Sequence, residues 1–402
     1  MVDCAAVSTA QTLPRRRVLF TVFLTVLLDL IGFGMILPIL SYYGQRFGAS
    51  AGQIGLLFAS YSLAQLLFAP PLGRLSDRVG RRPVLVGSIA GSVLAYGLFA
   101  FAPNFWLLVL ARALSGVAAS NYSIAQAYLA DISKPEERSK AMGFIGAAFG
   151  LGFVLGPAFG GSLSVFGDRA VGLAAAGLAL VNFLMALVWL PESLPVELRS
   201  RRVTTWFDIR GFAGLADNAP LFGLLLLYFI VTLCFSLMEA TLALYCQGRF
   251  GWDRGKTAGF FVYVGIVLVI VQGGLIGPLV RRFGERGLIL AGMAFMAAGL
   301  VLLPASPTVA LFAGAGALLA IGNGIHSPSV LGLISRLTDE SEQGGTIGVS
   351  RSFSALARTL GPPTGTYLFS AAGAGWPFLA AGGALALTLL WAWGLLRKIP
   401  LG

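Results

Sequence analysis

The sequence predicts an all-α integral membrane protein, with twelve transmembrane helices arranged as two pseudo-symmetric halves of six. The composition is 57% hydrophobic and only 11% charged, with a mean hydropathy of +0.83, which excludes an ordinary soluble domain. The chain has 402 residues, and at roughly 20 apolar residues per span this leaves room for about a dozen spans. Because the alternating pattern of a β-barrel is absent, helices are the remaining way to cross the membrane.

Twelve apolar segments are separated by loops that contain charge, proline or asparagine. Their predicted bounds are residues 17–41, 52–72, 83–101, 104–128, 139–164, 169–190, 219–246, 256–280, 287–303, 307–330, 343–370 and 374–396. The first segment is too long for the apolar region of a signal peptide, so we expect it to be retained. A polar linker, residues 191–218, divides an N-terminal six-helix bundle, residues 1–190, from a C-terminal one, residues 219–402. Within it, Trp206–Leu215 fits a helix on the membrane surface or a plain linker equally well.

The net charge of +11 follows the loops and does not indicate a nucleic-acid-binding surface. Twenty of the 28 basic residues fall on one predicted side of the membrane and five on the other, which leaves Arg112, Arg351 and Arg358 inside spans. The positive-inside rule therefore predicts a multi-pass protein of the inner (cell) membrane with both termini in the cytoplasm. The three cysteines are too few and too badly placed for a disulfide framework.

The two halves repeat one another. Two sets of residues recur at a spacing of 204 or 205: Gly73, Arg78 and Gly80 as Gly277, Arg282 and Gly284, and Gly143, Gly156, Pro157 and Gly160 as Gly348, Gly361, Pro362 and Gly365. A duplicated six-helix unit places the substrate site near the middle of the membrane, between the halves. The charges are not repeated, because Arg281 takes the place of Asp77 and Glu285 that of Arg81.

A charged segment separates the second and third predicted spans. Its residues are Gly73, Asp77, Arg78, Gly80, Arg81 and Arg82. The spacing resembles the signature loop of the major facilitator superfamily, and the resemblance implies that Asp77 and Arg81 form a gating latch with an acid at the end of span four, here Asp131. Its glycines permit close helix approach, and Asp77 is placed to face a helix N-terminus. The alternative is ordinary basic charge that only fixes the topology.

Span five carries a glycine and proline pattern made of Gly152, Gly156, Pro157, Gly160 and Gly161. The pattern resembles the antiporter motif of the same superfamily. Pro157 removes a backbone donor and bends the helix, while the glycines let span eight or another neighbour pack against bare backbone. A packing seam without a role in antiport is the alternative interpretation.

Asp29 and Arg112 are charged groups within predicted spans. A carboxylate at the bilayer centre costs about 2.5 to 3.5 kcal/mol on insertion scales, so Asp29 is a candidate proton carrier. With Gly32, Gly34 and Pro38 it resembles the first span of the twelve-span drug:proton antiporters of the tetracycline-resistance type, and Arg112 resembles their buried arginine. Arginine keeps its proton, so Arg112 acts only on a nearby carboxyl. Structural ion pairing and helix contacts are the alternatives.

Two further titratable residues lie at membrane depth. Glu239 is suited to hold a cationic substrate, and His326, the only histidine, belongs to the residue type whose charge changes near neutral pH. A structural hydrogen bond is the alternative for His326. Aromatic and sparse polar side chains predict a mainly apolar substrate cavity: Phe33, Tyr61, Gln65, Asn121, Gln126, Phe149, Phe153, Phe235, Gln272 and Asn323, with Arg358 deeper in span eleven.

These features together predict a proton-coupled exporter of drug-like hydrophobic or cationic molecules that works by alternating access, most simply as a monomer. Its expected partners are a small-molecule substrate, protons and the lipid bilayer. No enzyme is predicted, and neither cofactor nor metal, because a P-loop and His/Cys metal spacings are absent from the sequence. An importer or exchanger of a sugar or small metabolite is the alternative, and it would need a more polar cavity. A membrane receptor without transport is a weaker alternative, because it is expected to have soluble domains or long tails.

Overall fold

The computed structural model describes residues 15–133, 138–199, 218–338 and 343–399, and within them it is helical without any strand. The N-terminal helices are α1 (Arg15–Arg46), α2 (Ala51–Val79), α3 (Arg81–Ala100), α4 (Phe105–Ala118), α5 (Asn121–Ile132), α6 (Arg138–Ser164), α7 (Asp168–Trp189) and the short η2 (Val196–Leu198). The C-terminal helices are α9 (Ala219–Phe250), α10 (Arg254–Ile270), η3 (Val271–Leu275, a π-helical turn), α11 (Ile276–Ala305), α12 (Val309–Arg336), α13 (Gln343–Ala371) and α14 (Trp376–Lys398). The surface helix considered at Trp206–Leu215 lies outside the described residues.

Ten helices of the described chain are long and apolar enough to cross a membrane. One of them, Arg254–Ala305, is 52 residues long, and it turns back at Gly284, whose φ of 69° and ψ of 162° are not helical. The all-helical membrane fold is therefore confirmed. The count of twelve spans stays a prediction. It is reached if the 52-residue helix is divided at Gly284 into two spans and α13 is counted as a further span.

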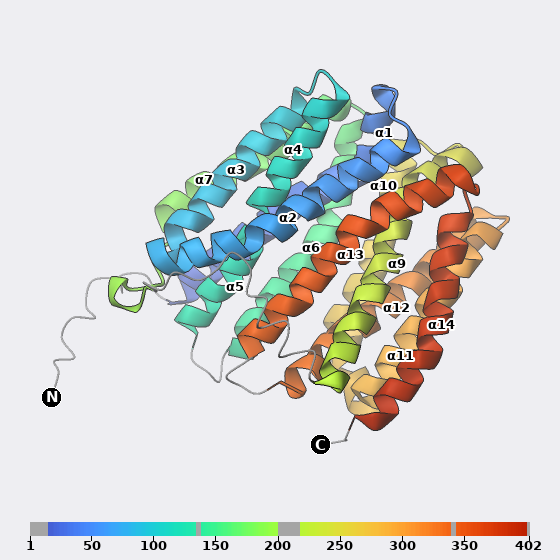
Figure 1. The fold of residues 1–402 in the computed structure, drawn as a ribbon. Coiled ribbons are helices and arrows are strands. Elements are labelled where there is room, and N and C mark those ends of the chain that lie inside the picture. Colours follow the sequence, from blue (N-terminus) through green and yellow to red (C-terminus); the bar gives the residue numbers. More distant parts are fainter. Residues whose placement is uncertain (1–14, 134–137, 200–217, 339–342, 400–402) are drawn as a thin grey trace.

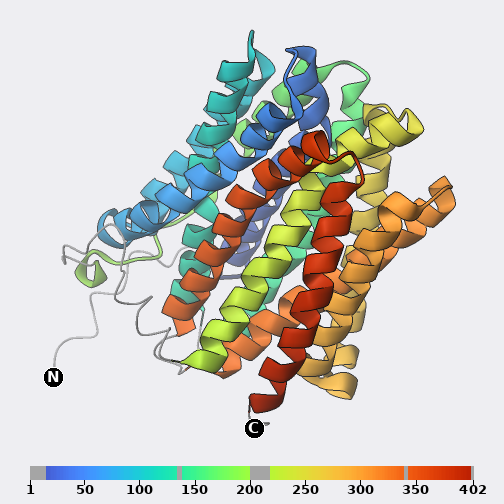
Figure 2. The ribbon, with the colours of Figure 1, turned by 45° about the vertical axis from the view of Figure 1, so that its right-hand side comes forward.

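The helices of each half pack mainly on one another (Figures 1 and 2). In the N-terminal half α1 contacts α6 and α7, and α3 contacts α4 and α7; in the C-terminal half α11 contacts α12 and α14, and α9 contacts α13 and α14. The halves meet along α2 with α13 and along α6 with α10. We call the end of the molecule that holds Gly80 and Gly284 the basic end, and the opposite end, which holds Gly48 and Gly251, the Trp252 end.

The signature segment is mostly helix and not loop, which corrects the expected span bounds. α2 continues through Val79, and α3 begins at Arg81, so Gly80 alone lies between them. The charged side chains leave the backbone hydrogen bonds of the helix intact and reach toward the membrane interface. Gly80 ends the helix with a φ of 118°, a conformation that side chains with a Cβ rarely adopt.

The glycines of the predicted antiporter motif pack mainly against α1, which is the neighbouring helix that the sequence left open beside span eight. A Cβ on Gly156 would lie 2.6 Å from the Cα of Gly34, and one on Gly160 would overlap the backbone of Met35. Only Gly161 faces α10, where a Cβ would overlap Ala258. The repeat places Gly361 and Gly365 against α9 in the same way, so each half holds its first helix through glycine contacts.

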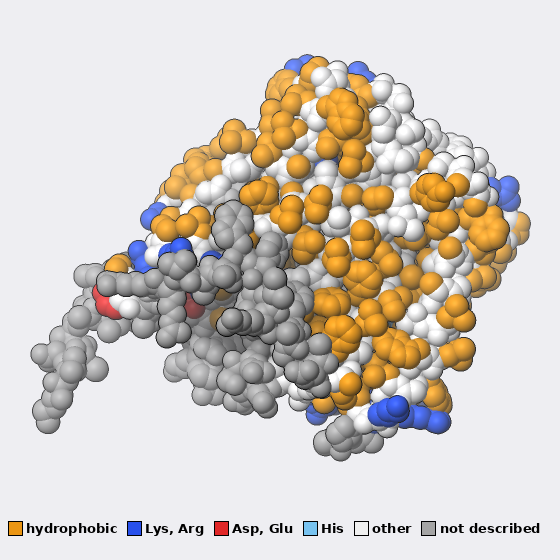
Figure 3. Space-filling model, in the orientation of Figure 1, with side chains coloured by type: hydrophobic (Ala, Val, Ile, Leu, Met, Phe, Trp, Pro, Cys, Tyr) orange, Lys and Arg blue, Asp and Glu red, His pale blue; other side chains and the backbone are white. Residues whose placement is uncertain are grey.

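The outer surface is apolar over a wide area. Figure 3 shows hydrophobic side chains across the described part of this face, with Lys and Arg near its edges. Large side chains such as Leu94, Trp106, Val188 and Leu390 are 66 to 76% exposed. A soluble protein does not leave so much apolar surface in water, whereas lipid tails cover it without cost.

Candidate functional site

A cavity of about 1920 Å³ lies between the two halves and reaches the basic end. Arg74 and Asp77 of α2 and Thr346 of α13 line the part near that end. The deep wall includes Tyr61 and Phe235, and most of the lining is apolar. Because both halves contribute walls, the cavity occupies the place that the repeat predicts for a substrate site.

Most of the residues predicted for the cavity line it. These are Phe33, Tyr61, Gln65, Asn121, Phe153, Phe235, Gln272, Asn323 and Arg358. Gln126 is half-buried on α5 and does not belong to the wall, and the side chain of Phe149 lies outside the described part of the structure. Gln272 and the neighbouring Gly273 lie in the π-helical turn η3, a type of distortion that is common at functional sites.

Asp29 lies on the cavity wall, where neutral groups surround its carboxylate. Ser92 of α3 donates a hydrogen bond to its Oδ1 at 3.3 Å, and Asn121 lies within hydrogen-bonding range. The pairing with Arg112 that the sequence allows is not formed in the described structure. A carboxyl at membrane depth without a basic partner can gain and lose a proton without breaking an ion pair.

Arg112 is the largest fully buried side chain and is 2% exposed. Its guanidinium lies over the ring of Tyr61 at 4.6 Å and near that of Phe33 at 5.8 Å. Within the described structure, its Nε and Nη1 have no hydrogen-bond acceptor. Aromatic faces attract a cation but supply no carboxylate, so the charge of Arg112 is only partly compensated.

Glu239 and Arg358 form an ion pair inside the C-terminal half. Arg358 Nη1 lies 3.4 Å from Glu239 Oε2, and the two side chains are 29% and 8% exposed. Both residues line the cavity, and together with Arg112 they also border a small pocket of about 30 Å³. Glu239 therefore has a basic partner already.

His326 is fully buried on α12 and lies apart from these charges. A Cβ added to Gly292 of α11 would lie 2.7 Å from the Cβ of His326, which shows how closely the two helices pack there. Neither ring nitrogen has a hydrogen-bond partner among the described residues. The structural hydrogen bond considered for His326 is thus not formed.

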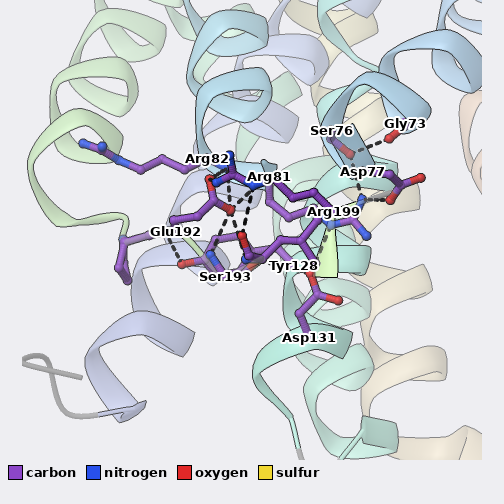
Figure 4. A network of polar contacts seen from close by, with 12 residues as sticks. Gly73, Ser76, Asp77, Arg81, Arg82, Tyr128, Asp131, Glu192, Ser193 and Arg199 are labelled. Carbon is purple, nitrogen blue, oxygen red and sulfur yellow. Dashed lines mark hydrogen bonds and ion pairs between the residues drawn. The ribbon is translucent and has the colours of Figure 1, made fainter. Parts of the chain in front are cut away.

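The predicted latch residues come together at the basic end (Figure 4). Arg81 Nη1 lies 2.6 Å from Asp77 Oδ1, and its Nε lies 3.0 Å from Asp131 Oδ2. Ser76, which the sequence did not single out, accepts a bond from Arg81 Nη1 at 2.7 Å. One side chain of α3 thus ties the end of α2 to the end of α5.

Glu192 belongs to the same network and was missed by sequence reasoning. Its carboxylate accepts hydrogen bonds from the backbone N–H of Arg81 at 2.8 Å and of Arg82 at 3.3 Å. Glu192, and not Asp77, therefore supplies the negative charge at the start of α3, where the helix dipole favours it. An acid directly after span six, next to Pro191, was the only sign of it in the sequence.

The Trp252 end is held shut by contacts between the halves. Tyr42 of α1 hydrogen-bonds Thr257 of α10 at 2.7 Å and donates to the Trp252 carbonyl at 3.0 Å. Arg254 of α10 lies 2.6 Å from the buried carboxylate of Asp168 of α7. Asp168 and Arg254 do not stand out in the sequence, because charges at helix ends look like ordinary topology determinants.

Comparison with known proteins places this architecture in a family. The model of the Major Facilitator Superfamily matches residues 22–286 and 270–401. The chain belongs to the major facilitator superfamily. It is 34% identical to the tetracycline resistance protein, class C, of Escherichia coli, over 91% of this chain and 93% of that protein. This major facilitator protein therefore has drug-resistance relatives along nearly its whole length.

Solved structures agree with the fold. The crystal structure of the human organic anion transporter MFSD10 (TETRAN) matches with a TM-score of 0.73 and 25% identity, over 94% of this chain and all of that one. A bacterial homologue of the human lysosomal transporter Spinster matches with a TM-score of 0.75, 16% identity and coverage of 96% and 97%. The second likeness concerns the fold alone.

Proposed function

We propose that this major facilitator protein is a proton-coupled exporter that exchanges drug-like, largely apolar small molecules for protons by alternating access. The observation that carries the proposal is the one-sided access to the cavity. The cavity reaches the basic end, whereas Tyr42, Thr257, Asp168 and Arg254 join the halves at the Trp252 end. This geometry is that of one state of a transporter whose site faces the two sides in turn.

The positive-inside rule supports an orientation for this state. The basic end faces the cytoplasm in the proposed topology, with both termini on the same side of the inner membrane. The protein then takes up its substrate from the cytoplasm and releases it at the Trp252 end. A single chain encloses the whole cavity, so a monomer suffices.

Asp29 is the proposed proton carrier. Its carboxyl faces the cavity and has neutral partners, Ser92 and Asn121. Protonation of Asp29 therefore breaks no ion pair and leaves no basic side chain without its counter-charge. Glu239 fits this role less well, because it forms an ion pair with Arg358. His326 also borders the cavity, and it is the second candidate for proton binding.

The names of the relatives support the export of organic molecules. The class C protein is a tetracycline resistance protein, and MFSD10 is described as an organic anion transporter. Sugar or metabolite import on the same fold is the second candidate function. It is less well supported, because side chains that hydrogen-bond a sugar are sparse in a wall dominated by residues such as Phe153, Val231 and Leu268.

Inverted membrane vesicles test the proposal. A panel of fluorescent drugs and dyes is added outside, and a proton gradient, acidic inside, is imposed. We expect at least one compound to accumulate with the gradient and to release protons from the vesicles. Asp29→Asn is expected to abolish this uptake while binding, measured by thermal shift, persists. Proton-driven uptake that is unchanged in Asp29→Asn would remove Asp29 from the mechanism, and gradient-independent uptake of the whole panel would refute antiport.

A further inference from the structure

We propose that the deep end of the cavity is an anion-binding subsite, in which the guanidinium groups of Arg112 and Arg358 bind an acidic group of the transported molecule. The inference rests on the proposed export function, because it names the chemical class of substrate for the same cavity. Amphipathic organic anions, with an aromatic or alicyclic body and one carboxylate, are the class that this arrangement favours.

The first argument is the incomplete compensation of Arg112. The side chain is 2% exposed, and its Nε and Nη1 find no acceptor in the described structure. Burying a cation without a hydrogen-bonded counter-ion is far more costly than burying a neutral group. The rings of Tyr61 and Phe33 hold the guanidinium in place and leave its donors unused. A carboxylate that approached these donors would therefore be bound strongly.

The second argument is that Arg358 has donors to spare. Among the described residues its one hydrogen-bonding partner is Glu239, at 3.4 Å, which is longer than an ordinary N–H···O bond of about 2.7 to 3.2 Å. A guanidinium carries five N–H donors, so this contact leaves most of them available to a ligand. With Arg112, it supplies two forks that match the planar geometry of a carboxylate.

The third argument is a space of the right size between these groups. A pocket of about 30 Å³ borders Arg112, Glu239 and Arg358. A water molecule needs about 10 to 15 Å³ of such space, so the pocket accommodates a small polar group and not a ring. Phe33, Tyr61, Glu239 and Arg358 line this pocket and the large cavity alike, so the two spaces adjoin at these side chains.

The fourth argument is a basic approach from the basic end. Arg351 precedes Arg358 by seven residues on one face of α13, about 10 Å along the helix. It also lines the cavity, and its guanidinium lies over Tyr122 of α5 at 4.5 Å. An anion entering from the basic end passes this cation before it reaches Arg358.

The same contacts argue against the cationic substrate that Glu239 suggested in the sequence. The acid is 8% exposed and already paired with Arg358, so a cation would have to displace a guanidinium to reach it. An anion does not have to displace either member of this pair. It offers a carboxylate to Arg358, which has spare donors, and to the neighbouring Arg112, which has no carboxylate partner in the described structure.

Three fluorescent probes with one ring system test the inference on the purified full-length protein in lipid nanodiscs. Pyrenebutyrate, pyrenebutyramide and pyrenebutylamine share the pyrene body and differ in charge. We expect the carboxylate to bind at least about tenfold more tightly than the neutral amide or the ammonium, the gain that a charge-assisted hydrogen bond provides. Equal affinities, or a preference for the ammonium, would overturn the subsite.

Variants locate the effect. Arg112→Gln and Arg358→Gln are each expected to weaken pyrenebutyrate binding about tenfold and to leave the amide unchanged. Glu239→Gln is expected to strengthen it, because Arg358 loses its competing partner. Arg397→Gln is the matched control: Arg397 stacks on Trp393 at 4.7 Å, as Arg112 does on Tyr61, but it lines neither the large cavity nor the small pocket. If Arg112→Gln does not fold, Arg112→Lys keeps the charge without the planar fork and is expected to weaken binding as well.

The outcome separates the two proposals. A carboxylate preference that depends on Arg112 establishes the subsite even if no panel compound is exported with the proton gradient, which would refute only the export function. Proton-driven export of a panel compound without any carboxylate preference would leave the export function standing and refute the subsite. A carboxylate preference that persists in both Arg112→Gln and Arg358→Gln also refutes it.

Discussion

The two glycine turns at the basic end differ more in their contacts than in their backbone. Gly80 and Gly284 both have positive φ, 118° and 69°, and stand 204 residues apart. Around the first, Arg81 bonds Asp77, Asp131 and Ser76, and Glu192 covers the start of α3. Duplication has kept the turn in both halves, whereas the interactions that fasten it are concentrated in one.

Among the described residues, the second turn has one ion pair, and its charges are reversed. Glu285, which stands in the place of Arg81, lies 3.4 Å from Arg336, which follows Asp131 by 205 residues. Acid and base have exchanged positions as a pair, so the contact survived while its polarity changed. Arg336 is 70% exposed, against 24% for Asp131, and an exposed pair contributes little to stability. We infer that the first turn is the latch and that the second mainly connects two helices.

The largest effect is expected from Arg81→Glu. The change replaces two attractive contacts by repulsion from Asp77 and Asp131, so the latch opens and the transport cycle is unbalanced. We expect proton-driven uptake in inverted vesicles to fall at least about tenfold, as a loss of more than one charged contact implies. The double variant Arg81→Glu with Asp131→Arg rebuilds the polarity of the second turn and should regain part of the activity. Activity of Arg81→Glu within twofold of wild type would contradict the latch.

Substitution of the turn glycines compares the backbones directly. Gly80→Ala strains a positive φ, which costs about 1 to 2 kcal/mol, and its Cβ would push aside the Glu192 carboxylate. Gly284→Ala has only the strain, because nothing in the described structure lies within 4 Å of its Cβ. Thermal unfolding in detergent, followed by tryptophan fluorescence, should show the larger fall in Tm for Gly80→Ala. Equal shifts would mean that Glu192 does not matter.

Glu192→Gln tests the charge at the start of α3 alone. The amide keeps the shape and one acceptor but loses the anion that the helix dipole and Arg199, 3.9 Å away, stabilise. We expect a loss of stability of about 1 kcal/mol and a moderate fall in uptake. Glu197→Gln, on the neighbouring 3₁₀ turn η2, is the control. A Glu192→Gln protein that matches this control in both measurements would exclude Glu192 from the network.

The smallest effect is expected from Arg336→Gln. The pair with Glu285 is exposed on one side, and such pairs contribute about 0 to 1 kcal/mol. Uptake and Tm should therefore stay near the wild-type values, in contrast to Arg81→Gln, which loses the equivalent contact in the first half. If both substitutions impair transport equally, the two turns act as symmetric latches, and the comparison made above is wrong.

The sequence predicted the features that depend on order along the chain. Apolar length and charge placement predicted the membrane helices, and the paired Gly-Pro motifs predicted that the two halves repeat one another. The spacing around Gly80 also identified Arg81 and Asp131 as partners, because a family pattern carried that information. The extent of α2 was missed, since charged side chains suggested a loop although the backbone remains helical.

Contacts between distant helices that no family pattern encodes could not be predicted. Asp29 and Arg112 are both charged and buried, and the sequence invites their pairing, yet helix rotation directs Asp29 to Ser92 and Arg112 to two aromatic rings. Asp168 and Arg254 were missed for a related reason. Each lies at a helix end beside a residue of opposite charge, Arg169 or Asp253, and only the approach of α7 and α10 makes them a pair.

Asp168 has a second basic neighbour, which matters for how the Trp252 end would open in the proposed transport cycle. Arg46, from the same half, lies 3.5 Å from its Oδ2, while Arg254, from the other half, lies 2.6 Å from its Oδ1. In the proposed alternating-access cycle, separation of the halves at this end would take Arg254 away from Asp168, while Arg46, which belongs to the same half, would stay. The carboxylate of Asp168 would then keep Arg46 as its basic partner and would not be left without a counter-charge. In that cycle, opening would cost Asp168 one of its two ion pairs and not both, which favours a reversible opening of this end.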